Sequence, residues 1–115
     1  YCPVDSLNPI DSIYVGVNRK DFNGYPSGGW MPEQRLTVEQ MIRGFTIQSA
    51  YASFEENSKG SIEEGKLADF IILSEDITAV NPDRLRAVYV EETYLGGRCV
   101  YKKKKYDTSE FCVVL

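Results

Sequence analysis

The spacing of apolar residues predicts an amphipathic helix near the start of the chain. This helix begins with Asn8 as its N-cap and Pro9 in its first turn, where the missing N–H of proline is tolerated, and it fades near Arg19. Spacings of three, one and three residues define one apolar face: Ile10, Ile13, Tyr14 and Val17. Such a face has to pack against another part of a protein.

A second, clearer helix is predicted over residues 37–54. Thr37 and Gln40 stand three residues apart, which is the spacing of a capping box. One face of this helix carries Val38, Met41, Ile42, Phe45, Ser49 and Ala50. The helix is expected to end around Phe54, before a polar stretch.

Between these helices, residues 20–36 are predicted to form a loop, because glycine and proline recur throughout them. A loop of this length inside a compact domain is uncommon and often functional. Trp30 and Met31 lie in this loop, and we expect both side chains to pack on another surface.

The second half of the chain carries strand patterns. Residues 70–73 form a short, continuous apolar run, which is typical of a strand that is covered on both faces. Residues 88–95 and 98–103 flank Gly96-Gly97, a two-residue hairpin turn. In the predicted register the facing pairs are Thr93 with Val100, Tyr94 with Cys99, and Glu91 with Lys102. The last pair is an attractive ion pair across the hairpin.

The order of these elements is unusual for a self-contained domain. Two amphipathic helices precede every strand, so the first half of the chain offers no sheet on which they can lie. We therefore expect a region N-terminal to this chain to cover them. Without that region, the face at Met41, Ile42 and Phe45 would need cover from a second copy of the chain.

Composition restricts the classes of function. The 115 residues are 43% hydrophobic, which is ordinary for a globular protein, and the net charge of -4 argues against a general nucleic-acid binder. The three cysteines, Cys2, Cys99 and Cys112, lie far apart without a CxxC pair, which favours a reducing, cytoplasmic compartment. No secretory leader or membrane-spanning apolar run is seen, so a membrane partner is not expected.

The chain contains no histidine. Hydrolytic zinc sites usually need two or three imidazole ligands, and imidazole is also the commonest general base near neutral pH. Catalysis by this chain would have to use carboxylates, tyrosine, lysine or cysteine alone. We therefore expect it to hold no catalytic metal.

Residues 60–73, with the sequence GSIEEGKLADFIIL, resemble the G-S-I-x-x-G-K-x-A-D-hydrophobic run near the C-terminus of amidohydrolase-superfamily enzymes. Segments within residues 36–50 look like the last barrel helix of that family, and residues 90–101 look like its closing hairpin. Residues 2–19 are similar to the S-D-x-P-V segment of the branch that includes N-substituted formamide deformylases and exoenzyme-regulatory homologues. The resemblance covers roughly residues 2–102.

This resemblance implies an α+β fragment of a larger metal-dependent hydrolase. Members of the family have a (β/α)8, or TIM, barrel and a small composite β-sandwich, which the N- and C-terminal segments build jointly. By analogy, residues 1–58 would be the C-terminal end of the barrel, comprising loop, helix, long loop and helix. Residues 59–103 would supply strands to the composite sandwich, and residues 104–115 would be a tail.

The resemblance also implies a reaction, the hydrolysis of a C–N bond other than a peptide bond by water activated on a divalent metal, expected to be zinc. Tyr1 stands where the family has its barrel aspartate, which orients or deprotonates that water. Either the aspartate lies beyond the start of this chain or this homologue lacks it. No catalytic residue and no metal ligand is therefore assigned here. The parent is expected to be an enzyme, and this chain alone is not.

Arg19 is the candidate for substrate binding, where it would hold a substrate loop, and the alternative is a solvated helix end. For Tyr25 and Trp30, packing of the loop onto the barrel is favoured over contact with substrate. The expected partner is the remainder of the amidohydrolase barrel.

Two further interpretations stay open. The chain can be a non-catalytic, β-rich association module or a degenerate homologue, for which a homo-oligomer is the expected partner. Residues 112–115, Cys-Val-Val-Leu, fit the prenylation pattern C-a-a-X behind the basic residues 102–105, although a chance match in a frayed terminus is favoured.

Overall fold

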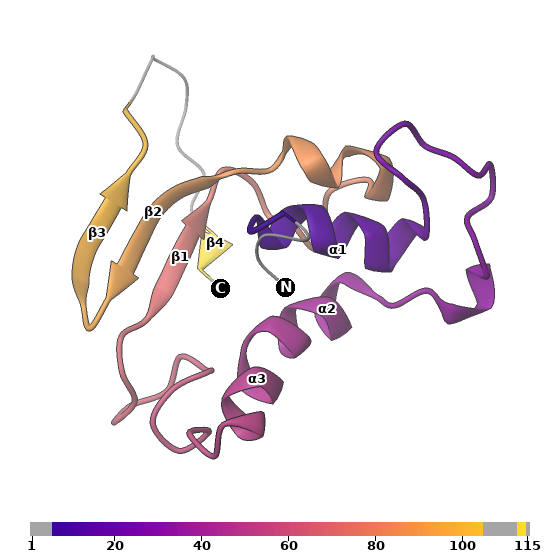
Figure 1. The fold of residues 1–115 in the computed structure, drawn as a ribbon. Coiled ribbons are helices and arrows are strands. Elements are labelled where there is room, and N and C mark those ends of the chain that lie inside the picture. The colour runs from indigo at the N-terminus through magenta and orange to yellow at the C-terminus, as the bar shows by residue number, and fades with distance from the viewer. Residues whose placement is uncertain (1–5, 105–112, 115) are drawn as a thin grey trace.

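The computed structural model describes residues 6–104 and the backbone of residues 113 and 114. The described part is an α+β arrangement in which a four-stranded antiparallel sheet stands beside three α-helices (Figure 1). The predictions made for Tyr1, Cys2 and Cys112 lie outside the described residues.

Helix α1 spans Pro9–Asn18, which confirms the first predicted helix. The side chain of Asn8 caps it by accepting a hydrogen bond from the backbone N–H of Ile10 at 3.1 Å. Arg19 ends it in a left-handed conformation with φ 56°. The predicted apolar face is the one that the protein buries, and Asn18 joins it by donating from its amide to the carbonyl of Pro82 at 2.8 Å.

The second predicted helix is two helices, α2 at Val38–Phe45 and α3 at Ile47–Ala52. Its capping box at Thr37 and Gln40 is confirmed, but the prediction of one continuous helix to Phe54 is wrong. Thr46 breaks the helix with φ -117° and ψ -100°. Its hydroxyl donates to the carbonyl of Ile42 at 2.8 Å, and the Ser49 hydroxyl donates to the carbonyl of Gly44 at 2.6 Å. These side-chain bonds compete with the helical ladder at the break.

The sheet has the strand order β3-β2-β1-β4, and its neighbouring strands are antiparallel. The strands are β1 at Phe70–Leu73, β2 at Val90–Leu95, β3 at Arg98–Lys102 and β4 at Val113–Val114. The predicted hairpin of β2 and β3 is confirmed, with Gly96 and Gly97 at φ 57° and 77°. Positive φ at both turn residues is what a twisted two-residue hairpin requires, and glycine adopts it readily.

The predicted register of this hairpin is correct beside the turn and wrong farther from it. Tyr94 faces Cys99 as predicted, but an irregularity between Thr93 and Tyr94 then shifts the pairing by one residue. Lys102 therefore faces Glu92 instead of Glu91, and their charged groups are 2.7 Å apart. For the same reason Thr93 faces Tyr101 and not Val100.

The core joins α1 to the second half of the chain. A 3-10 helix, η2 at Pro82–Ala87, packs along α1, and the sequence patterns did not predict it. The buried cluster consists of Ile10, Ile13, Tyr14, Leu73, Ile77, Leu85 and Val88. The first helix is thus covered by η2 and β1 from the second half of the chain, and a covering region N-terminal to the chain stays a prediction.

Away from this cluster, the described part of the chain leaves many apolar side chains exposed. Large apolar side chains lie on the surface of α2, α3 and the neighbouring loops, including Leu36, Phe45, Tyr51, Phe54 and Ile62.

Candidate functional site

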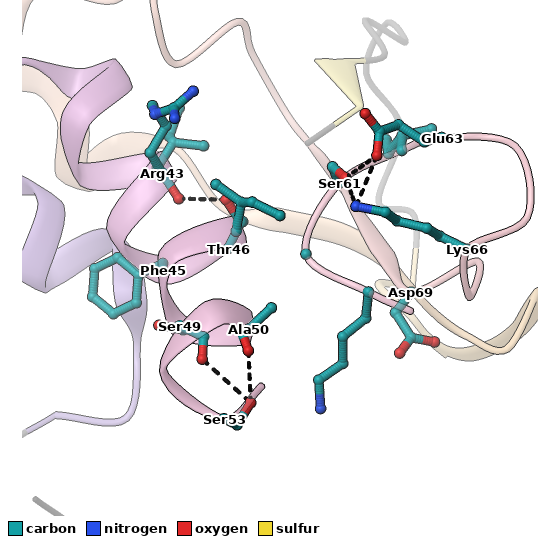
Figure 2. Close-up of a pocket in the computed structure, with 15 residues that line it drawn as sticks. Arg43, Phe45, Thr46, Ser49, Ala50, Ser53, Ser61, Glu63, Lys66 and Asp69 are labelled. Atoms are coloured by element: carbon teal, nitrogen blue, oxygen red, sulfur yellow. Dashed lines mark hydrogen bonds and ion pairs between the residues drawn. The ribbon is translucent and has the colours of Figure 1, made fainter. Parts of the chain in front are cut away.

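The segment that carries the resemblance, residues 60–73, folds back against α3 and enters β1 (Figure 2). In its first turn Lys66 Nζ lies 2.7 Å from Glu63 Oε2 and donates to Ser61 Oγ at 2.6 Å. The Ser61 hydroxyl donates in turn to Glu63 Oε2 at 2.8 Å. These three groups close a local network, and the Lys66 side chain is only 13% exposed.

The hydrogen bond from Lys66, followed by the one from Ser61, lowers the pKa of Glu63 below the ordinary glutamate value of 4.5. A lowered pKa in the folded state stabilises the protein above the unfolded pKa, and this contribution is lost as pH falls through the folded pKa. We predict that an NMR titration finds the Glu63 pKa below 4.5 and that Lys66→Met raises it towards 4.5. An unchanged Glu63 pKa in that variant would show that the network does not form in solution.

The end of the same segment is tied to the turn of the β2–β3 hairpin. Asp69 Oδ1 accepts a hydrogen bond from the backbone N–H of Gly96 at 2.7 Å. The N–H of Gly97 donates to the carbonyl of Ala68 at 2.9 Å. The charged side chains Lys66 and Asp69 thus both bond within the chain.

A groove of about 780 Å³ runs between α3 and this segment. Along it the hydroxyls of Thr46, Ser49 and Ser53 donate to nearby backbone carbonyls, as Figure 2 shows for Thr46 and Ser53. Ser53 Oγ also lies 2.8 Å from a carboxylate oxygen of Glu55. Lys59 pairs with that carboxylate at 2.6 Å, and its hydrogen bond is the main reason why the pKa of Glu55 is lowered. Glu55 is therefore a weak base, and this arrangement does not activate Ser53 as a nucleophile.

The residues that the structure describes do not match the ligand set of a hydrolytic metal centre. The sequence has no histidine, and the described residues contain no group of three or more Cys, Asp or Glu side chains that could hold a metal ion. The carboxylates at Glu63 and Asp69 already accept hydrogen bonds from their neighbours.

Arg19, the candidate for substrate binding, closes the loop that follows α1. Its Nε donates to the carbonyl of Trp30 at 3.0 Å, and the N–H of Trp30 donates to the carbonyl of Arg19 at 2.7 Å. Its guanidinium lies 5.0 Å from the centre of the indole ring. A short 3-10 helix at Pro32–Gln34 follows. Arg19 thus holds the loop, and contact with a substrate stays a prediction.

Tyr25 and Trp30 lie in the loop that Arg19 closes, with 72% and 63% of their surface exposed. The expectation that Trp30 and Met31 pack on another surface is not met within the described residues, because both are exposed. The link between Arg19 and Trp30 bridges eleven positions across a loop, and no periodic pattern signals it. The Glu63–Lys66 pair, by contrast, has the i,i+3 spacing that sequence inspection could have recognised.

Residues 2–101 match the family described as the amidohydrolase family. The chain is 32% identical over 101 residues to a Bacillus subtilis protein named as an amidohydrolase, YtcJ, covering 88% of this chain and 19% of the relative. It is 30% identical over 101 residues to the N-substituted formamide deformylase of Arthrobacter pascens, covering 88% of this chain and 18% of that enzyme. It is 34% identical over 99 residues to the Arabidopsis thaliana protein LONG AFTER FAR-RED 3, covering 86% of this chain and 16% of that protein.

The chain thus spans less than a fifth of the length of these three relatives. No solved structure matches it. In the part of the chain that the structure describes, none of the helices has the length and apolar character needed to cross a membrane.

Proposed function

Because this chain belongs to the amidohydrolase family, we propose that it is the C-terminal, structural portion of a metal-dependent hydrolase of amide-type C–N bonds. In this proposal the rest of the enzyme holds the metal, which supplies an activated water, and the present chain stabilises the barrel. Residues 1–58 would cover the end of the barrel, and residues 59–103 would add strands to the composite sandwich.

The observation that carries the structural role is the set of large apolar side chains that α2, α3 and the neighbouring loops leave exposed. Monomeric proteins rarely leave large apolar patches uncovered. Phe45 on α2 and Tyr51 on α3 are 46% and 66% exposed, so these two helices would lie against the barrel.

The contacts of residues 60–73 support the same role. Lys66 closes a local turn, and Asp69 fastens the segment to the β2–β3 hairpin, so these charged groups organise the strands of the chain. Their hydrogen bonds leave them poorly placed to act on a substrate. The reaction of the whole enzyme is assigned to the segments that this chain lacks.

We predict that the purified chain retains less than one equivalent of zinc after dialysis, because it has no imidazole and no clustered carboxylates in its described part. Elemental analysis against the protein concentration measures this directly. Stoichiometric zinc that survives dialysis would overturn the assignment of the metal to other segments.

A second candidate is a non-catalytic association module, and an apolar groove favours it. The groove has a volume of about 380 Å³ and lies between α1, α2 and the sheet, with Phe45, Phe70 and Leu95 among its lining residues. A second copy of the chain would fill it in that case. Transplanting the segment into a related amidohydrolase separates the two candidates, since an association module does not complete an enzyme.

A further inference from the structure

A cleft of about 490 Å³ opens between the end of α1 and the loop that follows it. Its volume lies within the range of small-molecule sites. Most of its walls are apolar or aromatic: Val15, Phe22, Tyr25, Pro26 and Trp30. Three charged residues, Arg19, Lys20 and Asp21, complete the lining. Apolar walls with a few polar groups are the usual composition of a ligand site.

The guanidinium of Arg19 is held in place by the loop and still has N–H groups that can donate to a ligand. Its Nε is occupied by the carbonyl of Trp30, and the group lies over the indole ring at 5.0 Å from its centre. Its two terminal nitrogens have no hydrogen-bond partner among the described residues. A guanidinium that stacks on a ring still presents these N–H groups at its edge, and a pair of them matches the two oxygens of a carboxylate.

The other charges of the cleft are already engaged. Lys20 forms an ion pair with Asp83 at 3.5 Å. Asp21 Oδ1 accepts hydrogen bonds from the backbone N–H groups of Asn23 and Tyr25 at 2.8 and 2.9 Å. Arg19 is therefore the charged group of this cleft that is best placed to bind an anion.

We infer that this cleft binds a small aromatic carboxylate, with its ring between Tyr25 and Trp30 and its carboxylate on Arg19. Exposed rings of this kind stack on a planar ligand, and the adjacent cation selects a negative charge over a neutral group. The inference does not depend on amide hydrolysis, since it requires neither a metal nor turnover.

Phenylacetate is the probe for this inference, and the signals of Trp30, the only tryptophan in the sequence, are the readout. We expect a saturable shift of the indole N–H resonance with a dissociation constant in the range of roughly 1 mM. Acetate lacks the ring and benzyl alcohol lacks the charge, so each should bind roughly tenfold more weakly.

Two variants locate the binding. Tyr25→Ala should weaken phenylacetate binding several-fold, whereas Tyr51→Ala, at a similarly exposed tyrosine on α3, should leave it unchanged. Arg19→Gln should abolish the preference for phenylacetate over benzyl alcohol. The inference is overturned if Trp30 shows no saturable shift with phenylacetate, or if binding is equal in the wild type and the Tyr25→Ala variant. Equal binding of benzyl alcohol and phenylacetate to the wild type would overturn it as well.

Discussion

Replacing Leu73 with alanine should lower the free energy of unfolding by about 2–5 kcal/mol, the range for a buried large-to-small substitution. Leu73 ends strand β1 with no exposed surface, and it packs in the cluster that joins the sheet to α1 and η2. The removed side chain would leave a cavity between these elements that they fill only in part. The shift of the urea denaturation midpoint, at constant slope, measures the loss.

Leu95→Ala is the matched control for this substitution, because Leu95 is also a leucine of the sheet but is 62% exposed. Its replacement should change stability by less than about 0.5 kcal/mol. Equal losses for the two variants would show that the Leu73 cluster is not the core of the protein. The neighbouring Ile72 is only half-buried, so its replacement should have a smaller effect than that of Leu73.

Gly60→Ala should be about as damaging, with a loss of about 2–5 kcal/mol from backbone strain and overpacking together. Gly60 has φ 93°, which side chains rarely adopt. An added Cβ would lie 2.7 Å from the Cβ of Ala50 and 2.9 Å from the Cα of Ile47. These contacts include backbone, so α3 and the 60–73 segment would have to separate. The melting temperature and the unfolding free energy measure the loss.

Gly65→Ala separates the two causes. Gly65 has a similar φ of 89°, but the space where its Cβ would lie is open. This variant should therefore lose only the conformational part, about 1–2 kcal/mol. If the two glycine variants were equally stable, the close approach of Gly60 to α3 would not contribute.

Local signals in the sequence were sufficient where the structure depends on neighbours along the chain. The Asn8 cap, the Thr37–Gln40 capping box and the Gly96-Gly97 turn each involve groups a few residues apart, and each was predicted correctly. The resemblance of residues 60–73 to the amidohydrolases was likewise visible without a structure, and the comparison over residues 2–101 confirms the family.

Features that depend on distant packing were not predictable in the same way. The alternation of apolar and polar residues does not indicate the irregularity between Thr93 and Tyr94. This irregularity pairs Lys102 with Glu92 instead of the predicted Glu91. The burial of Leu85 depends on η2 lying against α1, about seventy residues away along the chain. A local signal for η2 did exist, because the Asn81 side chain accepts from the N–H of Asp83 at the start of η2, as Asn8 accepts from the N–H of Ile10 at the start of α1.

In the candidate site, too, the residues could be recognised from the sequence but their long-range contacts could not. Sequence reasoning singled out Arg19, but its link to Trp30 crosses a loop with no regular period, so its geometry needed coordinates. Asp69 was recognised as part of a motif, whereas its bond to the turn at Gly96 depends on how the sheet folds. The predictions for Tyr1 and for residues 112–115 lie outside the described residues and stay predictions.

The central claim is that this chain stabilises a hydrolase without taking part in its chemistry, and a transplantation tests it most directly. Residues 2–101, which match the family, would replace the corresponding segment of the Arthrobacter pascens N-substituted formamide deformylase. Cooperative thermal unfolding and zinc content would establish that the hybrid is folded and loaded. The decisive measurement is its kcat for deformylation of an N-substituted formamide.

The account predicts that the folded, metal-loaded hybrid keeps kcat within about tenfold of the natural enzyme, a difference of about 1.4 kcal/mol in the barrier. The transplantation should instead lower the stability of the hybrid, because the transplanted segment contacts the barrel through side chains that differ from the original ones. A folded, zinc-containing hybrid whose kcat is lower by a hundredfold or more would show that this segment takes part in catalysis, and would contradict the account.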